Sequence, residues 1–366
     1  MNNLYIIIAL LLVITIGTIL FRKRTFNFIP LEIVMIGIGF ILGPYALNLL
    51  NKAENIQIEP VITLLIGATA LFAGLKFRIK NFVILRKLFI LTFLIYFVSF
   101  FISLFFFFII ARFALHSVPV PYLILISSIS ASIFPSYYLF SDKNIPDINI
   151  FAVMSNLTLF IVFLFLLFLT PILENGSPLT LNYPYSILLS LIDIIIFSSI
   201  MYFLFKHSTD KNEFLIIFFG IAIFNVVICY IFNINAASAM FFIGFILTNI
   251  LKKEYFKFRS IIESLEHPFF IGLLLLIGSY ISISGVRILS ISYFLIHLIS
   301  ITTTLFLFRH YTGKLKFDFI PQTGILYTIL LSLIILNNSF ITDIASSVIL
   351  ANLLFYTIYY LTKAHI

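Results

Sequence analysis

The residues of this chain that could do chemistry are ionisable or polar side chains placed inside long apolar stretches. Asp193 lies near the centre of the apolar segment 184–205, and His297 lies within the segment 288–308. A carboxylic acid or an imidazole in such a place can bind and release a proton. An ionisable residue inside a membrane span is a functional candidate by default, and a structural hydrogen bond to a neighbouring helix is the alternative for both residues.

Two other apolar segments, 118–141 and 321–337, combine hydroxyl side chains with proline. The first contains four serines followed by Pro135, and the second begins at Pro321. Proline removes a helical hydrogen bond, and in lipid the freed carbonyl groups must find partners in protein or water. We therefore expect helices that unwind beside a binding site, with proline-kinked packing helices as the alternative. The residues expected to line this site are Ser132, Pro135, Thr323 and Gly324.

The composition indicates that most of the chain lies in a membrane. Of the 366 residues, 62% are hydrophobic and only 10% are charged, and runs of about 20 apolar residues recur along the whole length. A soluble domain with this balance would expose large apolar patches and aggregate. The alternation typical of outer-membrane barrel strands is not found. The pattern predicts an all-α polytopic membrane protein, with the single cysteine, Cys229, as a small packing residue.

The basic residues predict the orientation of the chain. With the N-terminus outside, only Lys52, Arg112 and Arg287 fall on the outer side, and the other 19 of the 22 Lys and Arg residues fall inside. The positive-inside rule then places the C-terminus inside, and we expect the bacterial cytoplasmic (inner) membrane. This bias and contact with anionic lipid account for the net charge of +8, so a nucleic-acid partner is not expected. The roughly 13 expected spans are 3–20, 29–50, 60–77, 88–111, 118–141, 147–172, 184–205, 213–232, 235–251, 268–285, 288–308, 321–337 and 341–361.

The two interrupted segments are the fifth and the twelfth of these spans. They are seven spans apart, so they cross the membrane in opposite directions. Interrupted helices at matching places in two inverted halves indicate a binding site at mid-membrane. We expect one transmembrane domain with two inverted five-helix repeats, whose discontinuous helices cross, and a separate interfacial helix in the inner loop 252–268. The expected parts are an extra N-terminal helix in 1–28, a first repeat in 29–172, linking helices in 184–232 and a second repeat in 235–363.

Four segments carry local patterns in a recognisable order. They are PLEIVMIGIGFILGP at 30–44, LLIGATALFAGLKFRIK at 64–80, HPFFIGLLLLIGSYISISG at 267–285 and LFRHYTGKLKF at 307–317. In their order, spacing and orientation, these segments resemble the sodium/proton exchanger family of the monovalent cation:proton antiporter superfamily. The resemblance implies a secondary transporter that exchanges Na⁺ or K⁺ for protons by alternating access, without a cofactor and commonly as a homodimer.

In that family, the helix after the first broken one carries an Asn-Asp or Asp-Asp pair, whose aspartate alternately binds a cation or a proton. The stretch that resembles it here is FAVMSNLTLF at 151–160, with Ser155 and Asn156 in the place of the pair. Asn156 lies about ten residues into its span, roughly 14 Å deep in a hydrocarbon core of about 30 Å. An amide does not exchange a proton for a cation near neutral pH. The resemblance also implies that Arg309 is the basic residue of the later core helix.

Three classes of function follow from these residues. The first is a monovalent cation/proton antiporter in which Asp193 or His297 supplies the exchangeable proton. The second is a non-exchanging descendant of the fold, either a uniporter or a carrier of a neutral or anionic solute held by Arg309. The third is a membrane enzyme or a non-transport scaffold. Enzyme chemistry is not expected, since the sequence has no HExxH motif, no acidic pair on one helical face and no histidines spaced for a metal.

Overall fold

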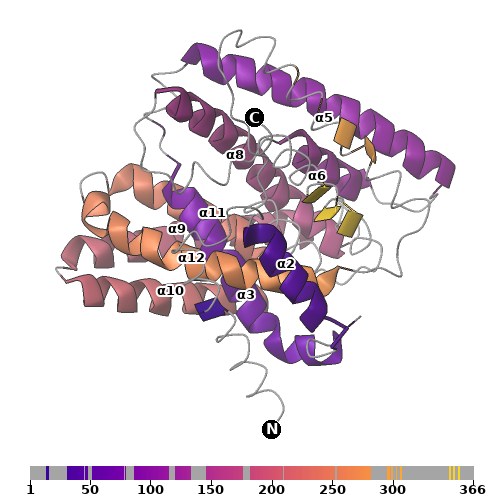
Figure 1. The fold of residues 1–366 in the computed structure, drawn as a ribbon. Helices are drawn as coiled ribbons and strands as arrows, with labels where there is room; N and C mark the ends of the chain where they lie inside the picture. The colour runs from indigo at the N-terminus through magenta and orange to yellow at the C-terminus, as the bar shows by residue number, and fades with distance from the viewer. Residues whose placement is uncertain are drawn as a thin grey trace. The chain divides into compact units, whose positions relative to one another are not determined.

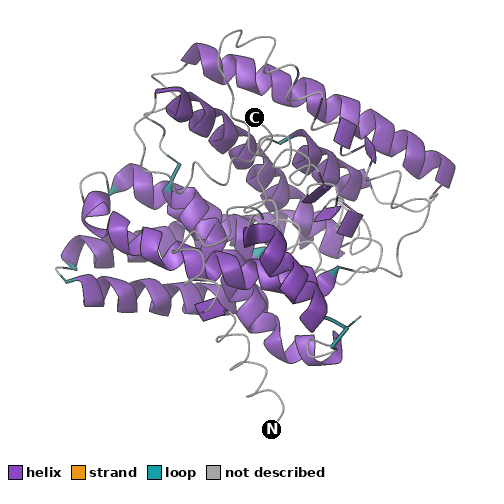
Figure 2. Ribbon diagram, viewed as in Figure 1, coloured by secondary structure: helices purple, strands orange, loops and turns teal. Residues whose placement is uncertain are grey.

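The computed structural model describes residues 31–44, 46–47, 52–77, 79, 86–114, 120–132, 146–175, 182–208, 210–251 and 254–281, with isolated residues outside these ranges. All regular structure in these ranges is helical (Figure 2). The helices, labelled in Figure 1, are α2 (Leu31–Leu42), α3 (Lys52–Leu75), α5 (Arg86–Ala114), α6 (Val120–Ala131), α8 (Pro146–Asn175), α9 (Asn182–His207), α10 (Lys211–Ile231), α11 (Ala236–Ile250) and α12 (Glu254–Tyr280).

Each of these helices lies on one of the expected spans, from the second to the tenth. Among the described residues, three stretches are long and apolar enough to cross a membrane, namely Ile90–Arg112 in α5, Tyr183–His207 in α9 and Asn212–Ile231 in α10. The last three expected spans lie outside the described residues, apart from a few helical positions. The expected number of spans, the second repeat and the crossing of two broken helices therefore stay predictions.

The inner loop 252–268 is helical from Glu254 on, as expected, but this helix is not separate from the tenth expected span. Helix α12 runs without interruption from Glu254 to Tyr280 and has Pro268 inside it. Similarly, α3 begins at Lys52, ahead of the expected span 60–77, and has Pro60 inside it. Hydropathy marks where apolar residues begin, whereas Glu, Lys and Arg residues propagate a helix beyond the apolar part.

The chain divides into two compact units. Unit 1 contains residues Met1–Lys76, Leu191–Ile283 and Tyr327–Ser346, and unit 2 contains Phe77–Ser190, Ser284–Leu326 and Ser347–Ile366. In unit 1, α2 packs along α12 and α3 packs along α11, while α12 and α10 also contact α3. In unit 2, α5, α6 and α8 pack against one another (Figure 1).

Glycines bring the backbones of α2 and α12 into direct contact. A Cβ atom added to Gly39 of α2 would lie 2.0 Å from the carbonyl oxygen of Leu275. A Cβ atom added to Gly278 of α12 would lie 2.1 Å from the carbonyl oxygen of Ile36. Each glycine therefore faces the residue three positions before the other glycine, and no other residue type fits at either place without moving a backbone.

The contact between α3 and α11 repeats this arrangement. A Cβ atom added to Gly74 would lie 2.0 Å from the carbonyl oxygen of Phe241, and one added to Gly244 would lie 2.4 Å from that of Leu71. Again, each glycine faces the residue three positions before its partner. The sequence around the two glycines of α2 and α11 repeats as well, since MIGIGFIL at 35–42 and MFFIGFIL at 240–247 are identical at six of eight positions.

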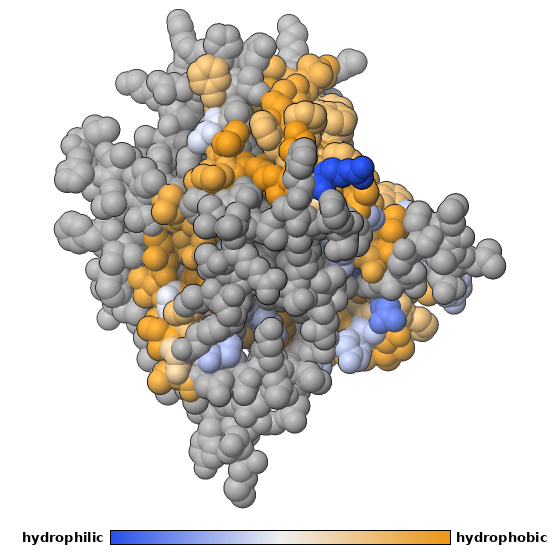
Figure 3. All heavy atoms as spheres, turned by 90° about the vertical axis from the view of Figure 1, so that its right-hand side faces the viewer, coloured by the Kyte–Doolittle hydropathy of each residue, from blue (hydrophilic) through white to orange (hydrophobic). Residues whose placement is uncertain are grey.

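The core of unit 2 is aromatic. Tyr96 and Phe100 of α5 are buried beside Ala131 of α6, and the ring of Phe165 of α8 stacks on Phe100 with centroids 5.6 Å apart. The opposite face of α5 is exposed and apolar, and Phe105 is 62% exposed. On the face shown in Figure 3, hydrophobic side chains cover much of the described surface. Such a surface is expected for helices that contact lipid.

Candidate ion and proton sites

The structure places Ser155 and Asn156 within a helix, as the sequence predicts. Both residues lie in α8, which begins at Pro146, so Asn156 is about 15 Å along the helix from its first residue. Because α8 has 30 residues, Asn156 lies about one third of the way along it, and its depth in the membrane stays a prediction. The expected site residues Pro135, Arg309, Thr323 and Gly324 and the possible proton carrier His297 lie outside the described residues.

Ser132 is buried at the end of the described part of the fifth expected span. Helix α6 ends at Ala131, four positions before Pro135 in the sequence. The N–H of Ser132 donates to the carbonyl oxygen of Ile129 at 3.2 Å, and the Ser132 hydroxyl donates to the same oxygen at 2.5 Å. A helix end that is buried in a membrane protein needs such partners for its last carbonyl groups. Ser132 thus provides two hydrogen bonds to one of these carbonyl groups, that of Ile129.

A stripe of hydroxyl side chains runs along the buried face of α5. Thr92, Tyr96, Ser99 and Ser103 recur at intervals of four, three and four residues, and each is at most 1% exposed. These intervals place the four side chains on one face of the helix. The Tyr96 hydroxyl lies 2.7 Å from the hydroxyl of Ser128 on α6. The hydroxyl of Ser99 is buried and has no hydrogen-bond partner within the part of the chain that the structure describes.

Among the described residues of unit 2, every buried polar side chain carries a hydroxyl group, and none is a carboxylate or a base. Several of these hydroxyls donate to a carbonyl of their own helix, as Ser127 does to Leu123 at 2.6 Å. Their unused lone pairs make this part of unit 2 a neutral source of oxygen ligands. Besides the tyrosines, the residues are Thr92, Ser99, Ser103, Ser127, Ser128, Ser130, Ser132, Thr158, Thr170, Ser190 and Ser347.

Asp193 lies in unit 1, on α9, and is buried against α10. The side-chain amide of Asn225 donates to both carboxylate oxygens of Asp193, at 3.2 and 3.0 Å. The thiol of Cys229, one turn further along α10, lies 3.5 Å from the Asn225 carbonyl oxygen and 4.0 Å from the carboxylate of Asp193. Asp193 is 5% exposed, Asn225 0% and Cys229 1%. The amide and the thiol are therefore partners of this carboxylate, and both are uncharged.

Phenylalanine rings also join the two helices that carry Asp193 and Asn225. The rings of Phe197 and Phe224 lie 5.9 Å apart, and those of Phe205 and Phe214 lie 4.3 Å apart. These ring contacts help to hold α9 against α10. A carboxylate as buried as that of Asp193 interacts strongly with any charge or proton that reaches it, because little water screens it.

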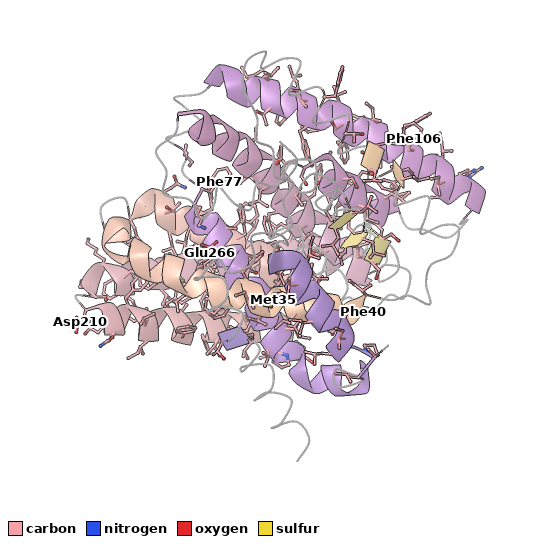
Figure 4. The ribbon with its side chains drawn as sticks, viewed as in Figure 1. Met35, Phe40, Phe77, Phe106, Asp210 and Glu266 are labelled. Atoms are coloured by element: carbon pink, nitrogen blue, oxygen red, sulfur yellow. The ribbon has the colours of Figure 1, made fainter. Side chains whose placement is uncertain are left out.

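A buried ion pair was not anticipated from the sequence. Lys76, which follows the end of α3, forms an ion pair with Glu266 of α12, and their side chains are 12% and 8% exposed. Glu266 is labelled in Figure 4. In the sequence, Lys76 counts only as one of the inner basic residues, and Glu266 lies in a loop expected to be at the membrane surface. The two residues are 190 positions apart, so no local pattern connects them.

Comparison with solved structures decides the fold. A structure of the sodium proton antiporter MjNhaP1 from Methanocaldococcus jannaschii at pH 8 matches 100% of this chain and 97% of its own, with a TM-score of 0.68 and 17% sequence identity. An electron-microscopy structure of MjNhaP1 matches 99% of this chain and 94% of its own, with a TM-score of 0.64 and 17% identity. This chain has the sodium/proton antiporter fold.

The antiporter fold confirms the resemblance read from the four sequence segments. No protein-family model matches the chain, and no curated protein matches its sequence significantly. The evidence for the antiporter fold is therefore structural and covers the full length. The fold and the apolar helices are those of a multi-pass membrane protein, whereas transport, the transported ion, the inner-membrane location, the orientation and the homodimer stay predictions.

Proposed function

We propose that this protein is a secondary transporter that carries a monovalent cation, Na⁺ or K⁺, across the membrane by alternating access. The observation that carries the proposal is the match over the full chain to the structure of a sodium proton antiporter. The division of the chain supports it, because helices α5, α6 and α8 belong to a different compact unit from α2, α3, α10, α11 and α12. Two compact groups of helices are what a transporter needs if one group is to move against the other.

The proposed cation site is at mid-membrane in unit 2. Ser155 and Asn156 on α8 stand where the family carries its acidic pair, and Ser132 lies at the end of α6. Pro135, Thr323, Gly324 and Arg309 complete the proposed set. The side chains among these residues that can bind a cation are neutral oxygen ligands, so the bound ion keeps its charge. Proton exchange at the site itself is then not available, because an amide and a hydroxyl stay uncharged near neutral pH.

We assign proton exchange to Asp193, with His297 as the second candidate. Within the described residues, the buried carboxylates are Asp193 and Glu266, and Glu266 forms an ion pair with Lys76. Asp193 has the neutral partners Asn225 and Cys229. Because no basic side chain compensates its charge in the described structure, a proton can neutralise it at lower cost than at Glu266.

Proteoliposomes provide the test of proton exchange. The purified protein is reconstituted with a pH-sensitive dye inside, a pH gradient is imposed, and NaCl, KCl or choline chloride is added. We expect Na⁺ or K⁺, and not choline, to collapse the gradient. Asp193→Asn keeps the size of the side chain and removes the proton site, so it should abolish the response. Glu213→Gln, at an exposed position of α10, is the matched control and should respond like the wild type.

The second candidate function is cation transport without proton exchange. The observation that favours it is the neutral character of every buried polar side chain in the described part of unit 2. Uptake of radioactive Na⁺ or Rb⁺ by the same proteoliposomes, measured beside the dye signal, separates the two functions. Cation uptake with an undisturbed pH gradient would establish a uniporter. The absence of both signals would contradict transport of these ions.

A further inference from the structure

Lys76 and Phe77 are consecutive residues whose side chains are held by different units. Unit 1 ends at Lys76, and unit 2 begins at Phe77. The ammonium group of Lys76 pairs with Glu266 on α12, which belongs to unit 1. The ring of Phe77 is 5% exposed and lies 5.2 Å from the ring of Phe160 on α8, which belongs to unit 2. The chain therefore leaves one unit and enters the other across a single peptide bond.

The end of α3 is held within unit 1 by two contacts to other helices. Its last turn is closed by the N–H of Lys76, which donates to the carbonyl oxygen of Ala73 at 3.2 Å. Gly74 lies directly on the backbone of α11 at Phe241, so this turn cannot move closer to α11. The Lys76 side chain makes the second contact, to a different helix, α12. Backbone packing thus holds the turn, and the ion pair holds the residue from which the connection departs.

The surroundings of the Lys76–Glu266 ion pair make the loss of either charge destabilising. Both side chains are largely buried, so removing either charge leaves the other in an environment where little water compensates it. Glu266 also lies two residues before Pro268 in α12. Proline cannot donate the hydrogen bond that a helix would normally give to the carbonyl group four residues earlier, so this turn of α12 depends more on side-chain contacts.

We propose that Lys76 and Glu266 are positioning residues for transport, which anchor the connection between the units so that movement of unit 2 begins at Phe77. This inference rests on the proposed alternating-access function. With the anchor intact, α3 and α12 stay in place while unit 2 moves, and the backbone dihedral angles on either side of the rigid Lys76–Phe77 peptide bond serve as the pivot. Without the Lys76–Glu266 pair, the end of α3 moves together with unit 2. Part of the movement then deforms unit 1 and does not contribute to transport.

The first test uses charge removal and charge reversal. We expect Lys76→Met and Glu266→Gln each to lower the maximal rate of cation transport about tenfold while the apparent affinity for the cation stays the same. The double variant Lys76→Glu with Glu266→Lys restores the pair and keeps the net charge, so it should recover most of the rate. Lys206→Met, at an exposed lysine of α9, is the control for loss of an inner basic residue. Unchanged rates in the single variants, or no recovery in the double variant, would overturn the proposal.

The second test does not require transport. Hydrogen–deuterium exchange of the purified protein in detergent is compared between the wild type and Glu266→Gln. We expect exchange about tenfold faster in the peptide that covers 73–79 and no change in the membrane-spanning part of α5, 90–112. Faster exchange throughout unit 1 would show a general structural role and contradict the anchor. If the wild type transports neither Na⁺ nor K⁺, the proposed function fails on that result, whereas the anchor is still decided by the exchange data.

Discussion

The side-chain amide of Asn225 spans the carboxylate of Asp193, donating to both of its oxygens at 3.2 and 3.0 Å. The two residues come from adjacent helices of unit 1, and each is almost completely buried. This pair joins α9 to α10 by hydrogen bonds at a position where phenylalanine rings otherwise make the contacts. It is also the polar group of the described structure that is best suited to hold a single proton in the membrane.

The Asp193–Asn225 pair predicts a specific pattern of stability. Asn225→Leu removes both donors and leaves a buried carboxylate without an amide partner, which should destabilise the protein by about 1–3 kcal/mol. The double variant Asp193→Leu with Asn225→Leu removes both polar groups and should recover most of the loss. Thermal unfolding in detergent, followed by the loss of the gel-filtration peak, measures both variants. A single variant as stable as the wild type would show that the pair contributes nothing to the fold.

The glycine contacts predict that two glycines of one helix respond in opposite ways to the same substitution. Gly39→Ala forces a Cβ atom onto the Leu275 carbonyl and should destabilise the protein by about 1–3 kcal/mol. Gly37→Ala, two positions away, places its Cβ where no atom lies within 4 Å and should leave stability unchanged or raise it. The thermal unfolding assay compares the two. Equal losses for both variants would contradict the backbone contact.

The hydroxyl stripe of α5 predicts a similar contrast. Tyr96→Phe deprives Ser128 of its partner and should cost about 1 kcal/mol. Ser99→Ala removes a buried hydroxyl that has no partner, so it should be neutral or stabilising. Cation uptake by proteoliposomes is measured for the same two proteins. A Ser99→Ala protein that is stable but transports poorly would reveal that this hydroxyl is used in transport and not in folding.

Asn156→Asp tests the alignment of α8 with the family's ion-binding helix. The substitution returns a carboxylate, which a cation and a proton can each neutralise in turn, to the middle of the span. We expect the variant to couple cation movement to proton movement in the dye assay even when Asp193 is replaced by Asn. Ser155→Ala is the control at the neighbouring position. A variant with no proton signal in either background would place the ion site elsewhere.

The sequence was informative where one span can be judged by itself. Long apolar runs located the helices from α2 to α12, because the thickness of a bilayer requires such lengths. Asp193 stood out as an acid inside a span. That it meets Asn225 depends on how α9 and α10 face each other, which hydropathy does not specify. The same limit hid the Lys76–Glu266 pair, whose members are 190 positions apart.

Some signals were present in the sequence but are weak on their own. The repeated segments at 35–42 and 240–247 are short and apolar, and in a chain that is 62% hydrophobic such matches are easily overlooked. Their meaning comes from geometry, since both place a glycine on a neighbouring backbone. The continuity of α12 was not expected for a different reason. Charged residues lower the hydropathy of 254–267, so hydropathy separates this part from the span that follows it, although such residues favour helix formation.

At the glycine contacts, the backbones of α2 and α12, and those of α3 and α11, touch directly, without side chains between them. In each contact, a carbonyl oxygen lies where any added carbon atom would clash with it. Each helix is therefore fixed both in its rotation about its own axis and in its position along that axis. Since α3 also contacts α12, the four helices share one register. A mechanical load applied at one end of this group is therefore carried to the other end with little shear, whichever side of the membrane it comes from.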